Sequence, residues 1–416
     1  MPQLSDDCFA HGGGAMTIDE ALALFRARVA PVAETEAVSL AEADGRVLAT
    51  DIHAHTALPP FDNSAVDGYA VRHADLTPDR DSRLAVVDRL QAGDAAGTLA
   101  PGTAVRIFTG APMPAGADTV YMQEDVEARD GIAILPPGLA RGANRRPAGE
   151  EIAAGAMALP AGTRLRPQEI ALAAGIGLDR LTVRRRLRVA IFSTGNELVE
   201  PGAVRGPAQV FDTNRLLLAG LLGRLGIAVS DLGILRDEPA GLAAALRAAA
   251  ADHDLVLTTG GVSTGEADHV KPAVEASGRL DVWRFAIKPG RPLALGTVAG
   301  TAFCGLPGNP VAVYVTFTHI VRGLIAALGG EAWRRPRPMA ARAGFNHKKR
   351  LGRTEFVRVT LADGPDGIPV ATRFAIEGAA VIRSLTETDA LMVLPDATER
   401  VTRGDLVGIV PIAGLA

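Results

Sequence analysis

The segment between residues 187 and 330 alternates apolar, strand-like runs with helical ones, and this alternation limits the chain to few folds. Runs such as LRVAIFS, IAVSDLGIL and DLVLTTGG are strongly apolar, and stretches such as DTNRLLLAGLLGRLG and EPAGLAAALRAAAA separate them. Apolar strands with helices between them are typical of a largely parallel sheet that is covered on both faces. The pattern therefore predicts a three-layer α/β/α domain, which we place at residues 186–333.

The sequence on either side of this domain follows other patterns, which divide it into further units. Short β-like runs separated by turn residues fill residues 59–149 and predict an inserted β-rich domain. Its flanks, 36–58 and 150–185, predict one small mixed domain with a short helix that begins at Pro167. Strand-like alternation returns in residues 334–416 and predicts a C-terminal β barrel or sandwich.

The N-terminal region predicts a single helix after a disordered start. Thr17 and Glu20 have the spacing of a capping box, so residues 16–35 should form a helix that joins the α/β domain. We expect the residues before Thr17 to be disordered. The first residues, MPQLSDDCFAHGGGAM, lack the basic start and apolar core of a secretory signal, so we expect a cytoplasmic protein.

Composition argues against several classes of protein. The chain of 416 residues has no run of eighteen apolar residues, so we expect no membrane span. Its formal net charge is −4, and we interpret its densest basic run, Arg184 to Arg186, as a solvated strand edge. Nucleic-acid binding is therefore not expected. Cys8 and Cys304 are the only cysteines, which leaves no disulfide framework and no thiolate metal cluster.

One short motif suggests a serine hydrolase. GVSTG at 261–265 matches the G-x-S-x-G pattern around a nucleophilic serine, here Ser263, and HGGG at 11–14 resembles an oxyanion-hole motif. However, HGGG precedes every predicted strand, and Gly260 and Gly261 make the turn longer than a sharp nucleophile elbow. A nucleophilic Ser263 is therefore the less favoured hypothesis.

Two strand ends carry the same chemistry. VAIFSTGNEL leads from one strand to Glu197, and LTTGGVSTGEAD leads from another to Asp268. Ligands of open α/β sheets bind where the strands end, because backbone N–H groups and helix N-termini face anions there. A carboxylate in such a place can hold Mg²⁺ between phosphates. The pattern favours a phosphorylated ligand with a metal, and helix capping by Glu197 and Asp268 is the open alternative.

Two further loops place cations and a helix start near strand ends. AIKPGRPLALG presents Lys288 and Arg291 around a Pro-Gly turn, in a chain whose lysines occur only at 271, 288, 348 and 349. GLPGNP leads through Pro307 into a helix that begins at Pro310, with Asn309 as its capping residue. Both loops fit an anion site, and ordinary turn chemistry is the alternative.

These segments, together with FDNSAVDGYAVR and IFTGAPMPAGAD, are similar in sequence and order to the molybdopterin molybdenumtransferase family, MoeA. The resemblance covers nearly the whole chain from about residue 16. It implies an elongated homodimer with four domains per chain. It also implies the reaction: molybdenum from molybdate is transferred to the dithiolene of adenylylated molybdopterin, and Mg²⁺-dependent cleavage of the pyrophosphate link releases AMP. Implied partners are a molybdopterin adenylyltransferase and molybdoenzyme-maturation proteins.

The resemblance also implies roles for particular residues, which fall into three groups. The catalytic group is Asp67, Thr109, Glu197, Asp237 and Asp268, of which Glu197 and Asp268 are the metal ligands. The molybdate- and phosphate-binding group is Arg284, Lys288, Arg291, Arg353 and Ser384. The pterin-loop group is Gly260, Gly261, Ser263, Pro307 and Pro310. The family often has lysine where this chain has Arg284 and Arg291, which keeps the charge but replaces a compact ammonium with a planar fork.

The resemblance leaves other functions to be weighed. A non-catalytic molybdopterin-binding scaffold is one, because the corresponding domain of gephyrin is similar. A scaffold could lose its acids and its lysine, yet Asp67, Glu197, Asp268 and Lys288 are all present. An adenylyltransferase on the same α/β domain would not need the β insertion that carries Asp67 and Thr109. We therefore favour the molybdenum-inserting enzyme.

Overall fold

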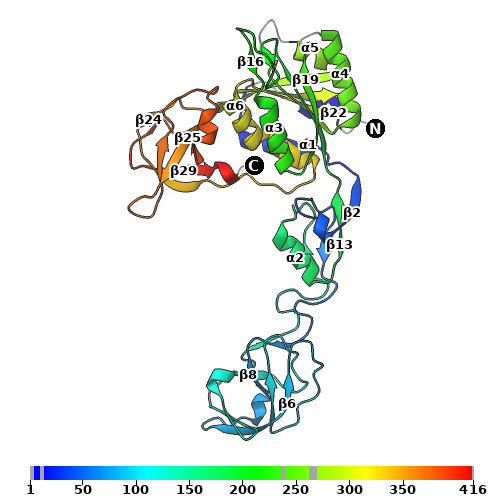
Figure 1. Cartoon of the computed structure of the whole chain (residues 1–416), viewed down its shortest axis with the longest axis vertical. Coiled ribbons are helices and arrows are strands. Elements are labelled where there is room, and N and C mark those ends of the chain that lie inside the picture. Colours follow the sequence, from blue (N-terminus) through cyan, green and yellow to red (C-terminus); the bar gives the residue numbers. More distant parts are fainter. Residues whose placement is uncertain (1–3, 10–13, 237–238, 262–268, 415–416) are drawn as a thin grey trace.

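The molecule is elongated, with three parts in a row and a fourth beside the first (Figure 1). The computed structural model describes residues 4–9, 14–236, 239–261 and 269–414. The α/β domain and the C-terminal barrel lie together at one end, and the inserted β-rich unit lies at the other end (Figure 1). A slender mixed unit that contains helix α2 connects them.

The α/β domain is built on a seven-stranded sheet in the order β1-β19-β21-β22-β18-β14-β17. Strands β17, β14, β18 and β22 run parallel, whereas β21 is antiparallel to both of its neighbours. The reversal follows from a tight turn at Ala299 and Gly300, which both have positive φ and join β21 directly to β22. The strands are β1 (Ala15–Met16), β14 (Arg188–Thr194), β17 (Ala228–Leu235), β18 (Leu255–Thr259), β19 (Gly278–Phe285), β21 (Pro292–Val298) and β22 (Thr301–Leu306).

Helices cover both faces of this sheet, so the predicted three-layer α/β/α domain is confirmed. One face packs against α1 (Ile18–Arg28), α3 (Asn214–Arg224), α6 (Pro310–Thr316), the π-helical η5 (Phe317–Val321) and α7 (Arg322–Leu328). The other face packs against α4 (Pro239–Asp252) and α5 (Val270–Glu275). The segment Pro310–Leu328 is long and apolar enough to cross a membrane by composition, but 94% of its apolar window is buried inside the protein. It is therefore accounted for as a core helix.

The N-terminal segment is more ordered than its composition predicts. Residues Asp6–Phe9 form a 3₁₀ turn, and the Phe9 ring is fully buried against Phe25 and Trp283. The Trp283 indole N–H also donates to the Phe9 carbonyl oxygen over 3.0 Å. The expectation of disorder before Thr17 is therefore wrong for this turn, because burial of one aromatic side chain fixes it. The capping box of α1 is confirmed: the Glu20 amide donates to Thr17 Oγ1, and the Thr17 amide donates to the Glu20 carboxylate.

The slender connecting unit draws its core from two segments that are distant in sequence. Leu48 from the first segment and Leu165 and Val183 from the second are buried in one apolar cluster. Pro167 starts α2, as its fixed φ predicts. The elements are β2 (Thr35–Ser39), η2 (Leu40–Glu42), β3 (Ile52–His53), β12 (Met157–Leu159), α2 (Pro167–Gly175) and β13 (Arg180–Arg184).

The inserted unit is a six-stranded sheet in the order β8-β5-β7-β6-β10-β9. It has small apolar clusters of its own, which include Ile107 and Val120 in one and Leu84 and Leu135 in the other. Its elements are β4 (Asn63–Ser64), β5 (Gly68–Val71), η3 (His73–Asp75), β6 (Ser82–Leu90), β7 (Thr103–Ile107), β8 (Thr119–Met122), η4 (Gln123–Asp125), β9 (Glu127–Arg129), β10 (Ile132–Leu135) and β11 (Arg145–Arg146).

The C-terminal unit is a closed barrel, as predicted. Strand β25 pairs with both β26 and β27, which closes the order β25-β26-β23-β29-β27. The short strand β20, which leaves the α/β domain at Lys288, pairs with the start of β25 and joins the two domains. The elements are β20 (Ile287–Lys288), β23 (Met339–Ala343), β24 (His347–Lys348), β25 (Thr354–Ala362), β26 (Val370–Arg373), α8 (Arg383–Thr386), β27 (Ala390–Leu394), β28 (Arg400–Val401), β29 (Leu406–Pro411) and η6 (Ile412–Gly414).

Candidate functional site

Three loops meet where the parallel strands β14, β18 and β22 end. These strands pair in register, so their carboxyl ends lie at one edge of the sheet. Gly260 follows β18, and its amide donates to the Leu306 carbonyl at the end of β22 over 3.2 Å. Its φ is +85°, and a Cβ at this position would lie 2.8 Å from the Thr194 carbonyl at the end of β14. Only glycine allows the three loops to approach this closely.

Asn214, at the start of α3, holds these loops together. Its amide nitrogen donates to Thr259 Oγ1 over 2.9 Å and to the Gly308 carbonyl over 2.7 Å. Thr259 Oγ1 in turn donates to the Pro307 carbonyl over 3.0 Å. Asn214 was not among the predicted site residues, although its position at the start of a predicted helix was a usable signal.

The buried polar atoms near this edge that have no hydrogen-bond partner among the described residues include Ser193 Oγ and Asn214 Oδ1. Buried polar groups in native proteins are nearly always paired, so each calls for a bound group or a water molecule. Both lie at or beside the strand ends where the ligand is predicted. The edge therefore has unused hydrogen-bonding capacity as well as glycine loops.

Glu197 lies on the surface, in the turn after β14. The next element after it is β15 (Leu198–Val199), paired with β16 (Val210–Phe211), so Glu197 does not cap a following helix. The alternative reading of Glu197 as a helix cap is therefore wrong. Three other predicted site residues, Asp237, Ser263 and Asp268, lie outside the described residues, and their roles stay predictions.

A buried arginine anchors the segment that carries Glu197. The Arg215 guanidinium contacts the carboxylates of Asp212, Asp231 and Glu200, with 3.0 Å between Arg215 Nε and Asp212 Oδ2. Asp212 follows β16, and Glu200 follows β15, so the ion pairs fix both ends of this paired segment to α3. Breaking a buried charge network of this kind is costly, because it leaves an uncompensated charge.

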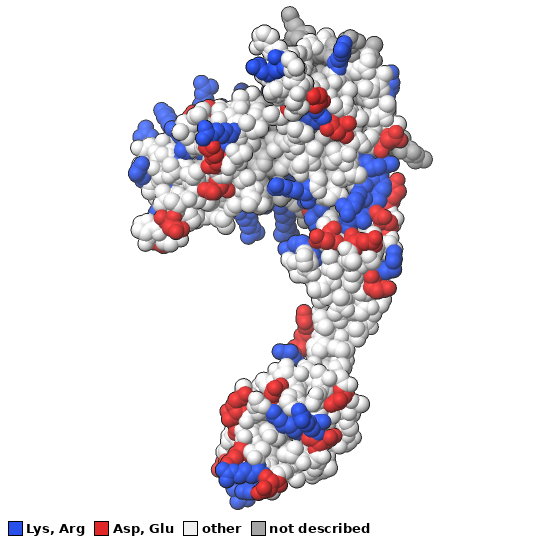
Figure 2. Space-filling model, in the orientation of Figure 1, with Lys and Arg blue, Asp and Glu red and all other residues white. Residues whose placement is uncertain are grey.

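A second feature is a cavity of about 170 Å³ between β20 and the barrel. Lys288 lines it, and its Nζ donates to Glu355 Oε1 over 2.8 Å, while His347 Nε2 lies 3.2 Å from the same oxygen. Glu355 is only 4% exposed, and its Oε2 has no partner among the described residues. Arg358 and Arg373 also line the cavity. Figure 2 shows basic side chains gathered around the barrel, where this cavity lies.

Arg358 connects the cavity to the predicted Ser384. Its Nε donates to Ser384 Oγ over 3.1 Å, and its Nη2 donates to the Gly378 carbonyl over 3.0 Å. Burial lowers the pKa of the Arg358 guanidinium, and the carboxylates of Glu377 and Glu355 oppose that shift. A guanidinium whose hydrogen-bond partners are mainly neutral groups can still bind an oxyanion by donating to it. Arg358 was not among the predicted site residues, because a charged residue within a strand pattern gives no sign of which cavity it borders.

The other predicted anion-binding residues do not line this cavity. Arg353 immediately precedes β25, and its buried Nε has no partner among the described residues. Arg284 and Arg291 are exposed where β19 ends and β21 begins. The positions of these three arginines do not test their predicted contacts with molybdate or phosphate, which stay predictions.

Asp67 and Thr109 form a direct pair in the inserted unit. The backbone N–H and the hydroxyl of Thr109 both donate to Asp67 Oδ1, each over 2.8 Å. These bonds lower the pKa of the Asp67 carboxyl, and the nearby Arg106 charge adds to the effect. The pair adjoins β5 and β7, whose sheet lies at the opposite end of the molecule from α6 (Figure 1). Within one chain, it does not meet the glycine loops.

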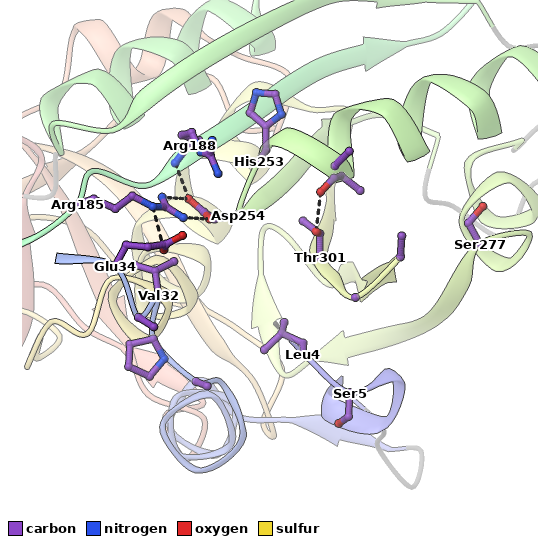
Figure 3. Close-up of a pocket in the computed structure, with 17 residues that line it drawn as sticks. Leu4, Ser5, Val32, Glu34, Arg185, Arg188, His253, Asp254, Ser277 and Thr301 are labelled. Carbon is purple, nitrogen blue, oxygen red and sulfur yellow. Dashed lines mark hydrogen bonds and ion pairs between the residues drawn. The ribbon is translucent and has the colours of Figure 1, made fainter. Parts of the chain in front are cut away.

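A hollow of about 1080 Å³ lies at the opposite edge of the sheet (Figure 3). Arg185 donates two bonds of 2.7 Å to the buried Asp254, which also accepts from the Arg188 amide. His253 contacts the Ala249 carbonyl and Ser230 Oγ. These side chains already hydrogen-bond to groups of the same chain. We therefore assign them a structural role and do not propose a reaction in this hollow. The interpretation of Arg185 as part of a solvated strand edge is wrong, because it pairs with a carboxylate distant in sequence.

Comparisons with known proteins agree with this architecture. Residues 16–177 match the family described as "MoeA N-terminal region (domain I and II)", residues 190–327 match "Probable molybdopterin binding domain", and residues 340–412 match "MoeA C-terminal region (domain IV)". The molybdopterin molybdenumtransferase of Haemophilus influenzae is 38% identical over 399 residues, which cover 95% of this chain and 98% of that protein. Molybdopterin molybdenumtransferase 2 of Mycobacterium tuberculosis is 38% identical over 68% of this chain and 73% of its own length.

Solved structures give the same result. The crystal structure titled as the molybdopterin biosynthesis MoeA protein from Pyrococcus horikoshii OT3 has a TM-score of 0.79 and 29% identity, and the match covers 96% of this chain and 100% of that one. The family resemblance read from the motifs is therefore confirmed, while the similarity to gephyrin stays a prediction. The chain belongs to the MoeA family, whose curated relatives are named molybdopterin molybdenumtransferases.

Proposed function

We propose that this enzyme of molybdenum cofactor biosynthesis transfers molybdenum from molybdate to adenylylated molybdopterin, with Mg²⁺, and releases AMP. The observation that carries the proposal is the connection between the glycine loops and the cavity at Lys288. Ala379 lines the cavity, and its carbonyl accepts the Val311 amide in the first turn of α6. That turn follows Pro307 and Gly308, which belong to the loop set at the strand ends. A phosphorylated pterin and an oxyanion can thus bind side by side.

The glycine loops and the cavity at Lys288 bind different parts of the substrates. The glycine loops let backbone N–H groups approach the phosphates, and the N-terminus of α6 adds a partial positive charge. Lys288 and Arg358 hold the molybdate dianion, which is a substrate, through charge-assisted hydrogen bonds. Fixed cations of this kind stabilise the negative charge that builds up as the anions come together.

Mg²⁺ fits the donors available in this chain. Among the described residues, no three His, Cys, Asp or Glu side chains gather into a cage. Mg²⁺ usually binds one or two carboxylates and takes its other ligands from water and phosphates. Glu197 and the predicted Asp268 would supply those carboxylates, and the bound ion would neutralise charge on the scissile phosphates.

A homodimer would complete the site. Asp67 and Thr109 lie at the far end of their own chain from the glycine loops, so we propose that the pair of one subunit faces the loops of the other. Asp67 is held ionised by Thr109, which suits a carboxylate that positions water or metal. The cytoplasm as location, and an adenylyltransferase that delivers the substrate, belong to the same proposal.

The test measures AMP release by purified protein given adenylylated molybdopterin, Mg²⁺ and molybdate. We expect molybdate-dependent release that is lost in Asp268→Asn and retained in Ser263→Ala. Loss in Ser263→Ala with retention in Asp268→Asn would instead support the nucleophilic serine. Pterin binding without AMP release by the wild type would support a scaffold.

A further inference from the structure

Two arginines and two aromatic rings form a row on the inserted β sheet, beside Asp67. Strand register places Arg89 of β6 opposite Arg106 of β7, and Arg106 opposite Tyr69 of β5. Cross-strand partners share one face of a sheet, so these three side chains lie side by side. Phe108 follows β7, and its amide is fixed by the Leu90 carbonyl over 3.0 Å.

The guanidinium groups stack on the rings. Arg106 Cζ lies 5.0 Å from the Tyr69 ring centre and 4.8 Å from the Phe108 ring centre, and Arg89 Cζ lies 4.8 Å from the Phe108 ring centre. Two guanidinium groups therefore stack on the Phe108 ring. Arginine stacks on aromatic faces without losing the N–H groups at its edge, so the Arg89 donors stay available to a ligand.

Neither arginine makes an ion-pair contact among the described residues, although Arg106 is near enough to Asp67 to help lower the pKa of that carboxyl. Arg106 donates to the Gly68 carbonyl over 3.0 Å and to the Gln123 side-chain carbonyl, which are both neutral. Over the described ranges, neither Arg89 nor Arg106 forms an ion pair, although many other arginines of this chain do. Like charges on directly opposed strand positions are destabilising. An anion bound to the row would relieve that repulsion.

We propose that Arg89, Phe108 and Arg106 form a binding ledge for the nucleoside 5′-phosphate half of the substrate. The ledge adjoins the Asp67–Thr109 pair, so it reaches the reaction when that pair faces the partner subunit, and in this respect it rests on the proposed function. The phosphate lies against the guanidinium edges, and the planar base lies against the exposed part of the Phe108 ring. Base stacking of this kind tolerates any ring and supplements the charge.

The test is equilibrium binding of AMP to the full-length protein by isothermal titration calorimetry, with adenosine and inorganic phosphate as separate probes. Arg89→Gln should raise the Kd for AMP roughly tenfold, the effect of one charge-assisted contact, and should leave adenosine binding unchanged. Phe108→Leu should weaken both AMP and adenosine. Arg83→Gln is the matched control, because Arg83 is an exposed arginine of the same strand, and its Kd should equal that of the wild type.

Two results would overturn the ledge: no AMP binding by the wild type, or equal AMP binding by Arg89→Gln, Phe108→Leu and the wild type. Equal loss of AMP and inorganic phosphate binding in Arg89→Gln, with no effect of Phe108→Leu, would mean a free-phosphate site and would overturn the nucleotide assignment. The proposed function is judged separately by AMP release. Variants that bind AMP normally while the wild type releases it would refute the ledge and leave the function intact.

Discussion

Thr109 donates two hydrogen bonds to one oxygen of Asp67, from its backbone N–H and its hydroxyl, each over 2.8 Å. Because both bonds favour the ionised carboxyl, they lower the pKa of Asp67. A group with a lowered pKa keeps its charge as the pH falls, until the pH reaches that pKa. If the reaction needs ionised Asp67, activity will persist to low pH.

Thr109→Val tests this relationship, because it removes the hydroxyl and keeps the backbone bond. The pKa of Asp67 should then rise, and the acid limb of the pH profile of AMP release should move to higher pH. Thr103→Val is a matched control, since Thr103 lies on β7 and its hydroxyl donates to the Ala100 carbonyl rather than to Asp67. An acid limb that stays in place in Thr109→Val would show that Asp67 does not set it.

Gly260→Ala should damage the strand-end site more than the fold. The φ of +85° alone costs a residue with a Cβ about 1–2 kcal/mol, and that atom would also press on the Thr194 carbonyl. We expect a lower melting temperature and loss of pterin binding. In Gly220→Ala, the control within α3, the Cβ meets open space, so this change should stabilise by about 0.5–1 kcal/mol. Pterin affinity that is unchanged in Gly260→Ala would place the ligand elsewhere.

Asn214→Ala should loosen the three loops. It leaves Thr259 and the Gly308 carbonyl without a donor in a buried place, which typically costs about 1–3 kcal/mol. Denaturant unfolding should show this loss, and the KM for the pterin should rise. Thr213→Ala is the neighbouring control, because Thr213 is exposed and its side chain makes no capping bond. Equal stability of both variants would contradict the role given to Asn214.

Lys288→Ala should weaken molybdate use selectively. Lys288 is the lysine of the cavity, so its loss should raise the KM for molybdate about tenfold, equivalent to about 1.4 kcal/mol, with little change for the pterin. Lys271→Ala, on the exposed face of α5, should leave both values unchanged. Were the pterin KM to rise and the molybdate KM to stay constant, the cavity would not be the molybdate site.

His319 should make the protein less stable in mild acid. Its ring stacks on Phe356 with centres 4.3 Å apart, and both ring nitrogens are buried without a partner among the described residues. Burial, with a contribution from Arg335, lowers its pKa to about 3. The unfolded state takes up a proton near pH 6.5 and the folded state does not, so the free energy of unfolding falls by up to about 1.4 kcal/mol per pH unit between these values.

The measurement compares denaturant unfolding of the wild type and His319→Leu at pH 7 and pH 5. The wild type should lose more stability than the variant over this interval. His253→Leu is a useful comparison, since His253 is hydrogen-bonded through both nitrogens. An identical pH dependence in the wild type and His319→Leu would mean that His319 is not neutral in the folded protein.

Local patterns predicted the parts of this structure that depend on neighbours in sequence. The capping box at Thr17, the helix start at Pro167 and the alternating strands of the α/β domain follow from such patterns. The barrel could be predicted for the same reason. Motifs such as GLPGNP also located the loops at the strand ends, because glycine and proline mark turns wherever they occur.

Contacts between distant segments could not be predicted in this way. Arg185 pairs with Asp254 and Arg358 with Ser384, and nothing near either arginine specifies its partner. Phe9 is ordered by a pocket formed around Trp283, far along the chain. The site was therefore predicted as a set of loops, whereas Asn214, Glu355 and Arg358, which join those loops, required the folded structure.

The most direct test of the central claim is a single-turnover experiment with enzyme in excess over adenylylated molybdopterin, in the presence of molybdate and Mg²⁺. Molybdenum bound to the isolated pterin is measured by mass spectrometry, and AMP is measured by chromatography in the same samples. We predict that both products form in equal amounts and that neither forms without molybdate. AMP formed at the same rate without molybdate, with a pterin that stays free of molybdenum, would contradict the account.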